Sequence, residues 1–357
     1  MTIFTFLLLC LAGQQQAFGV PMLLVGGSAL VWNLRRVNLR SFQTWCWVIF
    51  LTIVTVQTLR ICADASILEF APPLVFSVSR PHSVMVLGGW AIVAALCLGD
   101  PVTRNQALWW AGVVAILGIA QFHTGASGFY WAIPFKTRFF SVFSYVNNSG
   151  SFFILASGLA MTYKLRGIPL VMLFYYCAYL TQCRFAMAVI PILPLYALLT
   201  RRWRVWGLLG IAVTGFVALA LKLDYLLSVG RWQEYEAFYH FSPHFPWFGA
   251  GPWGYHWFAN TYGPEWLHAL FVRNPNCHNS YLMFFYEYGV IGASLLGCLA
   301  TKLLCRRVSV LTLAIILVSL HGFIDMPWHC PAVVALAVIM AKLESTTDLT
   351  EGLGDST

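Results

Sequence analysis

Apolar runs separated by short polar turns make up most of this chain. A helix needs about 20 apolar residues to cross a bilayer, and several of the runs approach that length. We expect spanning helices at 17–33, 42–59, 83–99, 105–122, 147–163, 168–182, 184–200, 204–222, 281–303, 307–323 and 330–343. With the weaker run at 1–13, the pattern predicts an all-α polytopic membrane protein with about 12 transmembrane helices.

Composition favours a membrane protein over a soluble domain. Hydrophobic residues make up 59% of the chain and charged residues 10%, whereas soluble chains carry roughly 25% charged residues. We interpret residues 1–343 as a single transmembrane domain, with one large loop at 223–280 between the ninth and tenth helices. The polar and acidic residues 344–357 are predicted to form a disordered cytoplasmic tail.

The basic residues predict the orientation, because Lys and Arg concentrate in cytoplasmic turns. One side of the expected alternation holds 13 of the 21 basic residues: Arg35, Arg36, Arg40, Arg104, Lys164, Arg166, Arg201, Arg202, Arg204, Lys302, Arg306, Arg307 and Lys342. We therefore expect both termini in the cytoplasm and the loop 223–280 on the outer side. The net charge of +8 is then mostly a topology signal and requires no nucleic-acid partner.

The outer loop 223–280 is polar and aromatic, and it holds five of the chain's 15 Trp residues. Aromatic residues recur at helical spacing after Arg231, at Trp232, Tyr235, Phe238 and Tyr239. This spacing favours an amphipathic helix that lies on the membrane surface. The Trp residues are typical of anchors at the membrane interface, and stacking against sugar rings is the alternative.

Two outer arginines are candidates for binding an anion. Arg184 lies between two apolar runs, where a cation is costly and tends to mark a ligand site. The alternative is a side chain that extends to the interface only for solvation. Arg231 offers planar, bidentate recognition that suits a pyrophosphate, or it pairs with Glu234 or Glu236 on the surface.

His278 is the candidate for acid–base chemistry. It precedes the apolar run that begins at Tyr281, where we expect a helix to begin. A helix N-terminus disfavours the imidazolium form, so the ring is expected to be neutral near physiological pH and able to accept a proton. The alternative is a polar residue that only shapes the turn into the helix.

Other polar groups are expected on the same side. His321 and Asp325 are four residues apart at a helix end, and they either pair with each other or support a nearby site. Asn147 begins another span, where its amide can bind sugar or phosphate or cap the helix. Gly249 and Gly251 favour a tight turn over a phosphate-binding loop, because no strand precedes them and no GK[ST] follows.

The ten cysteines are scattered, mostly within apolar runs, where they act as small hydrophobic residues. No CxxC pair and no Cys/His spacing indicates a metal centre, and we expect neither a metal nor another cofactor. A bridge between Cys277 and Cys330 on the outer side stays open at this point.

The polar motifs follow a recognisable order. Arg184 precedes Arg231 and a Pro/Gly stretch that ends at Gly251. The chain then reads His278-Asn279-Ser280-Tyr281-Leu282 and Glu287-Tyr288-Gly289-Val290-Ile291-Gly292. From about 140 to 340, this order resembles the O-antigen ligase and polymerase superfamily of bacterial inner membranes. It is also similar to the bacterial protein O-oligosaccharyltransferases.

The resemblance implies an inner-membrane glycosyltransferase whose active site faces the periplasm. Its donor would be an O-antigen glycan on undecaprenyl pyrophosphate, its acceptor a lipid A-core sugar hydroxyl, and its reaction metal-independent and inverting. In this interpretation His278 is the base, and Arg184 and Arg231 bind the pyrophosphate. Candidate substrate-binding residues are Asn147, Arg138, Lys136, Asn279, His321, Asp325, Gly249 and Gly251.

Several alternatives remain open. An O-antigen polymerase or a protein (pilin) O-oligosaccharyltransferase would use the same donor. From other classes, the chain could be a transporter or a non-catalytic assembly protein of the envelope. A transporter should show paired charges or broken helices near the middle of the bilayer, whereas the pattern here concentrates polar groups at one face of the membrane.

Overall fold

The computed structural model describes residues 19–34, 41–63, 80–99, 102–124, 143, 146–198, 231–241, 247–252, 254–255, 262, 277–304 and 309–354. Within these ranges the chain is mostly helical and contains no strand. This confirms the expected all-α class. The expected spans at 1–13 and 204–222, together with Lys136 and Arg138, lie outside the described residues.

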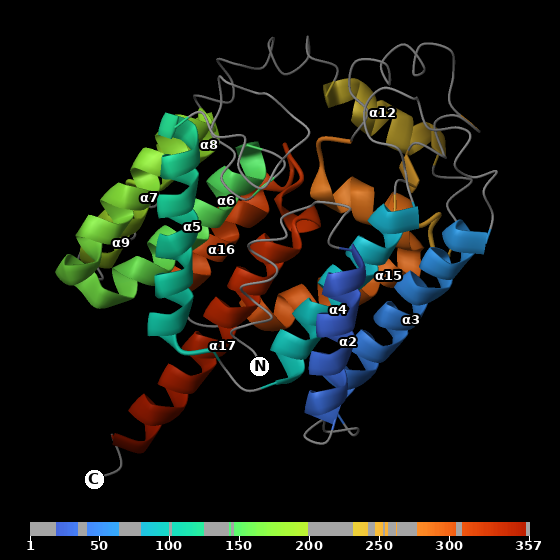
Figure 1. Cartoon of the computed structure of the whole chain (residues 1–357), viewed down its shortest axis with the longest axis horizontal. Coiled ribbons are helices and arrows are strands. Elements are labelled where there is room, and N and C mark those ends of the chain that lie inside the picture. The colour runs from blue at the N-terminus through green and yellow to red at the C-terminus, as the bar shows by residue number, and fades with distance from the viewer. Residues whose placement is uncertain are drawn as a thin grey trace.

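The helices pack as a bundle (Figure 1). The first part of the chain forms α2 (Gly19–Leu34), α3 (Phe42–Ala63), α4 (Arg80–Leu98), α5 (Arg104–Thr124), α6 (Val146–Ala160) and the 3-10 helix η3 (Met161–Gly167). The middle part forms α7 (Ile168–Thr181), α8 (Arg184–Val189), α9 (Ile192–Leu198) and α12 (Arg231–Phe241). The last part forms α15 (Ser280–Leu304), α16 (Val310–His321), the 3-10 helix η5 (Pro327–His329) and α17 (Pro331–Gly354).

Three of the described helices are long and apolar enough to cross a membrane. They are α3, α5 and the Ser280–Thr301 part of α15. Shorter apolar helical segments cover Val20–Asn33, Ser83–Leu98, Arg184–Leu198 (which comprises α8 and α9) and Val310–His321. These helices agree with a membrane protein and fall at positions where spans were expected. A total of twelve spans stays a prediction.

Small residues allow α2 and α4 to pack backbone against backbone. A Cβ atom on Gly26 would lie 2.8 Å from the carbonyl oxygen of Gly88, and one on Gly88 would lie 2.6 Å from the nitrogen of Leu23. Helices in lipid commonly associate through close packing at small residues, because burial of apolar surface contributes little to helix association there. The α2–α4 contact therefore resembles a membrane helix pair.

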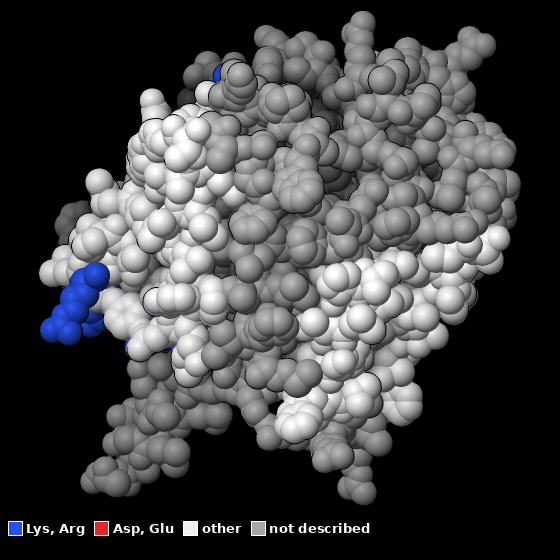
Figure 2. Space-filling view, in the orientation of Figure 1, with Lys and Arg blue, Asp and Glu red and all other residues white. Residues whose placement is uncertain are grey.

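Many large apolar side chains are exposed on the described part of the bundle. In α2, Leu24, Val31 and Trp32 are 65%, 65% and 62% exposed. The described surface in Figure 2 is mostly uncharged, with Lys and Arg side chains gathered at the left edge. Large continuous apolar surfaces are rare on soluble monomers, so this surface suits contact with lipid.

The expected span at 184–200 is interrupted. It forms two short helices, α8 and α9, separated at Ile190 and Pro191. Proline has no N–H to donate and its ring clashes with the preceding turn, which explains the interruption. The expected span at 147–163 likewise passes from α6 into η3, where Lys164 adopts a φ of 53°.

Within the segment expected to be disordered, residues 344–354 continue α17. Lys342 donates hydrogen bonds to two carbonyls at the end of α4. Glu344 accepts a hydrogen bond of 2.6 Å from the Thr312 hydroxyl. These contacts hold the beginning of the predicted tail against the bundle, and composition alone does not reveal them.

Two basic residues of η3 lie at one end of α7, and Arg184 lies at the other. Lys164 and Arg166 precede this helix, and Arg184 follows it. The 14 residues of α7 span about 21 Å at 1.5 Å per residue. Figure 1 shows α8 and α12 at the same, upper end of the bundle. This arrangement agrees with polar groups gathered on one face, while the side of the membrane stays a prediction.

Candidate functional site

Several elements meet at residues 322–326, a segment that follows α16 and is called here the turn 322–326. The backbone N–H of Ser280, at the start of α15, donates to the carbonyls of Gly322 (2.9 Å) and Asp325 (3.0 Å). The first N–H groups of a helix have no partner within the helix. The turn 322–326 supplies such a partner and thereby fixes where α15 begins.

Asn279 caps α15 and connects it to the loop helix α12. Its Oδ1 accepts hydrogen bonds from the N–H groups of Tyr281 (2.9 Å) and Leu282 (3.0 Å), as an N-cap residue does. Its Nδ2 donates to the carbonyl of Phe323 (3.1 Å) and to the hydroxyl of Tyr235 (2.8 Å). The amide of this candidate substrate-binding residue is therefore already used within the protein.

The α12 helix is fixed to the same turn. The Tyr235 hydroxyl donates to the carbonyl of Phe323 at 2.8 Å. Arg231 begins α12 and precedes Tyr235 by four residues, about one helical turn. The helix expected after Arg231 is confirmed, whereas its amphipathic character and its position on the membrane surface stay predictions. The beginning of α12 lies one turn from the contact with Phe323.

His321 connects the end of α16 to α6 and α8. Its Nδ1 lies 2.8 Å from the Ser151 hydroxyl oxygen. Its ring stacks on Phe185 of α8, with centroids 4.5 Å apart and an interplanar angle of 4°. His321 is only 2% exposed, so its role here is to hold α6 and α8 beside the turn 322–326.

Asp325 makes a second contact with α6. Its side chain is buried, and its carboxylate accepts hydrogen bonds from the Asn147 amide and from the Met326 N–H. Hydrogen bonds of this kind offset the cost of burying a charge. Of the two interpretations offered for His321 and Asp325, these contacts with α6 favour support of a nearby site.

Arg184 is the first residue of α8 and is exposed. Within the part of the chain that the structure describes, no acidic side chain forms an ion pair with it. The preceding Cys183 is buried, and burial raises the pKa of its thiol to about 11. Cys183 therefore stays protonated near neutral pH, which leaves Arg184 as the chemically available group of this hairpin tip.

His278 lies one residue before the Asn279 cap. The residue is half-buried and its Nδ1 atom is buried. Through Asn279 and Ser280 it is tied to the turn 322–326. The segments that carry the three principal candidates, His278, Arg184 and Arg231, thus all contact this turn or the residues that flank it.

The glycine stretch packs against a break in α15. Gly289 has a φ of 69° and interrupts the helix. In an unbroken helix the carbonyls before the break would accept from N–H groups four residues later. A loop at 247–251 replaces those partners. Its three bonds run from Ala250 N to Tyr286 O (2.9 Å), from Gly251 N to Glu287 O (2.9 Å) and from Ile291 N to Trp247 O (3.1 Å).

Glycine is required where this loop approaches α15. Gly249 has a φ of 75°, and a Cβ atom there would lie 2.2 Å from the Glu287 carbonyl oxygen. Gly251 has a φ of 92°. The tight turn favoured by the sequence is confirmed. The N–H of Gly251 is bonded to α15, so Gly251 does not present this group to a phosphate.

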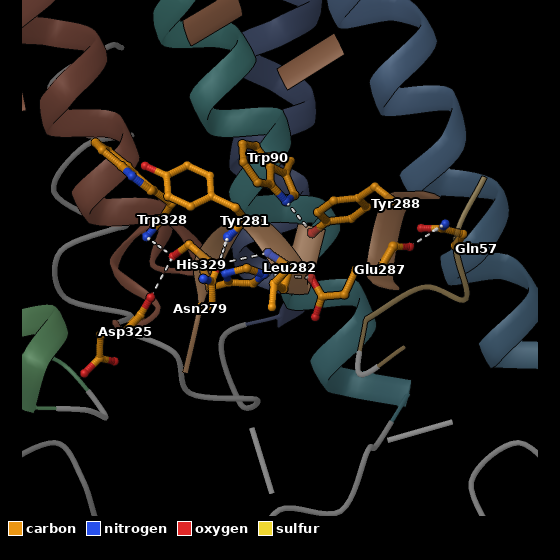
Figure 3. A network of polar contacts seen from close by, with 11 residues as sticks. Gln57, Trp90, Asn279, Tyr281, Leu282, Glu287, Tyr288, Asp325, Trp328 and His329 are labelled. Carbon is orange, nitrogen blue, oxygen red and sulfur yellow. Dashed lines mark hydrogen bonds and ion pairs between the residues drawn. The ribbon is translucent and has the colours of Figure 1, made fainter. Parts of the chain in front are cut away.

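Two ionisable side chains that the sequence analysis did not select meet at this break (Figure 3). The Glu287 carboxylate lies 3.1 Å from Nε2 of His329, and the two side chains are 7% and 14% exposed. The His329 ring also stacks on Phe284 at 4.5 Å. Gln57 donates to the carbonyls of Glu287 (2.8 Å) and Phe248.

A neighbouring polar contact joins α4 to the same part of α15. Trp90 Nε1 donates to the hydroxyl of the fully buried Tyr288 at 2.9 Å. Besides the motif that begins at Glu287, the sequence signal for this region is an acidic residue within an apolar run, because ionisable residues in membrane segments tend to be functional. Its partner His329 follows 42 residues later, and no local pattern connects the two.

The site combines a half-buried imidazole, an exposed guanidinium and a buried carboxylate around one turn. These groups can accept a proton and bind an anion. Among the described residues, no group of three or more His, Cys, Asp or Glu side chains is arranged to hold a metal ion.

Comparisons of the chain with protein-family models, with curated proteins and with solved structures found no match.

Proposed function

We propose that this protein is a membrane glycosyltransferase that moves a glycan from undecaprenyl pyrophosphate to a sugar hydroxyl of lipid A-core. One observation carries the proposal: the segments bearing His278 and Arg231 bond to the turn 322–326 of an apolar helical bundle, and the segment bearing Arg184 contacts the adjoining His321. A base and two cations beside lipid-facing helices suit a donor whose charge lies next to a lipid chain.

In the proposed reaction, His278 accepts the proton of the acceptor hydroxyl. The acceptor oxygen forms a bond to the anomeric carbon as the bond from that carbon to the pyrophosphate oxygen breaks. The pyrophosphate leaves with the bonding electron pair, and attack from the opposite face inverts the carbon. General-base assistance is typically worth about 10²–10⁴-fold.

Arg184 and Arg231 are proposed to stabilise the charge that develops on the leaving pyrophosphate. Cations placed before the reaction often supply a large part of the rate enhancement. The exposure of Arg184 and the lack of an acidic partner within the described residues support this role. Asp325, which is bonded to Asn147, is proposed to hold the turn and not to bind the donor.

The test is reconstitution of the purified protein in vesicles with a lipid-pyrophosphate glycan and lipid A-core. Transfer of one glycan to lipid A-core supports the proposal. Growth of the glycan on the donor lipid indicates a polymerase, and transfer to an added pilin peptide indicates a protein O-oligosaccharyltransferase. No transfer to any of these acceptors overturns the proposal.

A second candidate is a transporter of a lipid-linked glycan, and the break in α15 favours it. Transporters place substrates at broken helices with paired charges, and Gly289 and the Glu287–His329 pair provide both features. However, the carbonyls of Tyr286 and Glu287 are bonded to the loop 247–251. Movement of a labelled donor lipid from one leaflet of the vesicle membrane to the other, without glycan transfer, would favour the transporter over the enzyme.

A further inference from the structure

The α15 helix consists of two pieces. The first piece begins at Ser280, two residues after the candidate base His278. Gly289 separates residues 280–288 from the rest of the helix. The backbone bonds around the break involve the loop 247–251 and Gln57. The second piece of α15 therefore does not by itself dictate where the first piece lies, and side-chain contacts must contribute.

One face of the first piece contacts the segment that precedes α17. Residues 280, 284 and 287 recur at helical spacing and so share a face. Ser280 bonds to the backbone of Asp325, and its hydroxyl also accepts from the N–H of Trp328 at 3.3 Å. Phe284 stacks on His329, and Glu287 bonds to the same ring. His329 thus holds the end of the first piece that is farther from His278.

We infer that Glu287 and His329 are positioning residues, which hold the first piece of α15 so that its start, with Cys277 and His278, stays seated at the turn 322–326. Ionisable groups within membrane segments are costly and usually paired. In this environment, loss of one partner leaves the other buried and poorly solvated. The first piece would then shift, and the seating of Cys277 and His278 would loosen.

Cys277 provides a reporter that does not depend on catalysis, because it is fully buried beside His278. The full-length protein in detergent is treated with N-ethylmaleimide, and the modification rate of the Cys277 peptide is followed by mass spectrometry. Glu287→Ala should raise that rate by about tenfold, the change expected from loss of one hydrogen bond to a charged group. His329→Phe, which keeps an aromatic ring against Phe284, should also raise it.

Two variants separate positioning from general loss of stability. Glu287→Gln retains an oxygen that accepts from His329, so its rate should stay within about twofold of the parent. Glu344→Ala is the matched control, because Glu344 is also a buried carboxylate and accepts a hydrogen bond from Thr312 of α16. An unchanged Cys277 rate in both Glu287→Ala and His329→Phe overturns the inference. So does an equal rise in Glu344→Ala.

The catalytic consequence rests on the proposed function, whereas the Cys277 result does not. In the vesicle transfer assay, Glu287→Ala should lower kcat about tenfold with little change in the KM for the donor. Glu287→Gln should keep kcat near the parent value. If the parent protein shows no transfer but Cys277 responds as expected, the proposed function fails and the inference stands. If the parent is active and kcat is unchanged in Glu287→Ala, positioning of the base is refuted.

Discussion

The two ends of the bundle both bury polar groups, but these groups do different things. At the basic end, around Lys342 and Glu344, each polar contact joins one pair of helices, and Lys164 and Arg166 are exposed. Lys342, for example, binds carbonyls that end α4. At the other end, α6, α12 and α15 bond to the turn 322–326, and α8 stacks on the adjoining His321.

The difference shows why polar content alone does not locate a site. Arg104 at the basic end lies 4.2 Å from the ring centroid of Tyr163, so that cation is already engaged by the protein. Arg184 at the opposite end is exposed without a described acidic partner. The turn 322–326 differs from the basic end because several helices that are distant in the chain meet there, close to the helix that begins with the exposed Arg184.

The largest expected effect comes from His278→Ala. Loss of the base should reduce glycan transfer by about 10²-fold or more, while the protein stays folded in the membrane. The measurement is the initial rate of transfer in reconstituted vesicles. His123→Ala is the control, since this exposed histidine bonds to Tyr176 on another part of the bundle. Transfer at the parent rate in His278→Ala would remove His278 from the mechanism.

Gly249→Ala should destabilise the protein by about 3 kcal/mol, because the new Cβ clashes with the Glu287 carbonyl and the backbone has a positive φ. The measurement is the midpoint of thermal unfolding in detergent. Gly112→Ala is the matched control in α5, where no atom lies within 4 Å of the added Cβ. That change should be neutral or stabilise by up to about 1 kcal/mol. Equal unfolding midpoints for the two variants would show that close packing of the loop 247–251 against α15 does not stabilise the protein.

Arg184→Lys should reduce transfer about tenfold, because the charge remains while the planar, bidentate donor is lost. Thermal stability should not change, since the side chain is exposed. Arg166→Lys, at the basic end, should leave transfer unchanged. Equal rates for Arg184→Lys and the parent would show that Arg184 serves only to orient its helix.

The smallest expected effect tests the basic end. Thr312→Val removes the hydrogen bond to Glu344 and should lower the free energy of unfolding by about 1–2 kcal/mol without reducing transfer in the folded protein. Unfolding and transfer are measured on the same preparation. A loss of transfer larger than the loss of folded protein would show that the two ends are coupled.

Part of the site could be predicted from local sequence. The position of His278 before an apolar run predicted a helix start, and Ser280 does begin α15. Asn279 was expected at the site, but its function as the helix cap follows from contacts with Tyr281 and Leu282. Cys277 and Cys330 are both buried, and the structure contains no disulfide between them. Disulfide pairing depends on geometry that sequence spacing does not specify.

Hydropathy by itself determined the helical class and the approximate positions of most described helices, because a bilayer requires internally bonded apolar segments. The spans expected at 42–59 and 105–122, for instance, correspond to α3 and α5. Only the tertiary structure decided that Glu287 meets His329 and that the loop 247–251 completes the hydrogen bonds of a broken helix. Those contacts join residues far apart in the chain, so their formation depends on how the helices pack and not on local pattern.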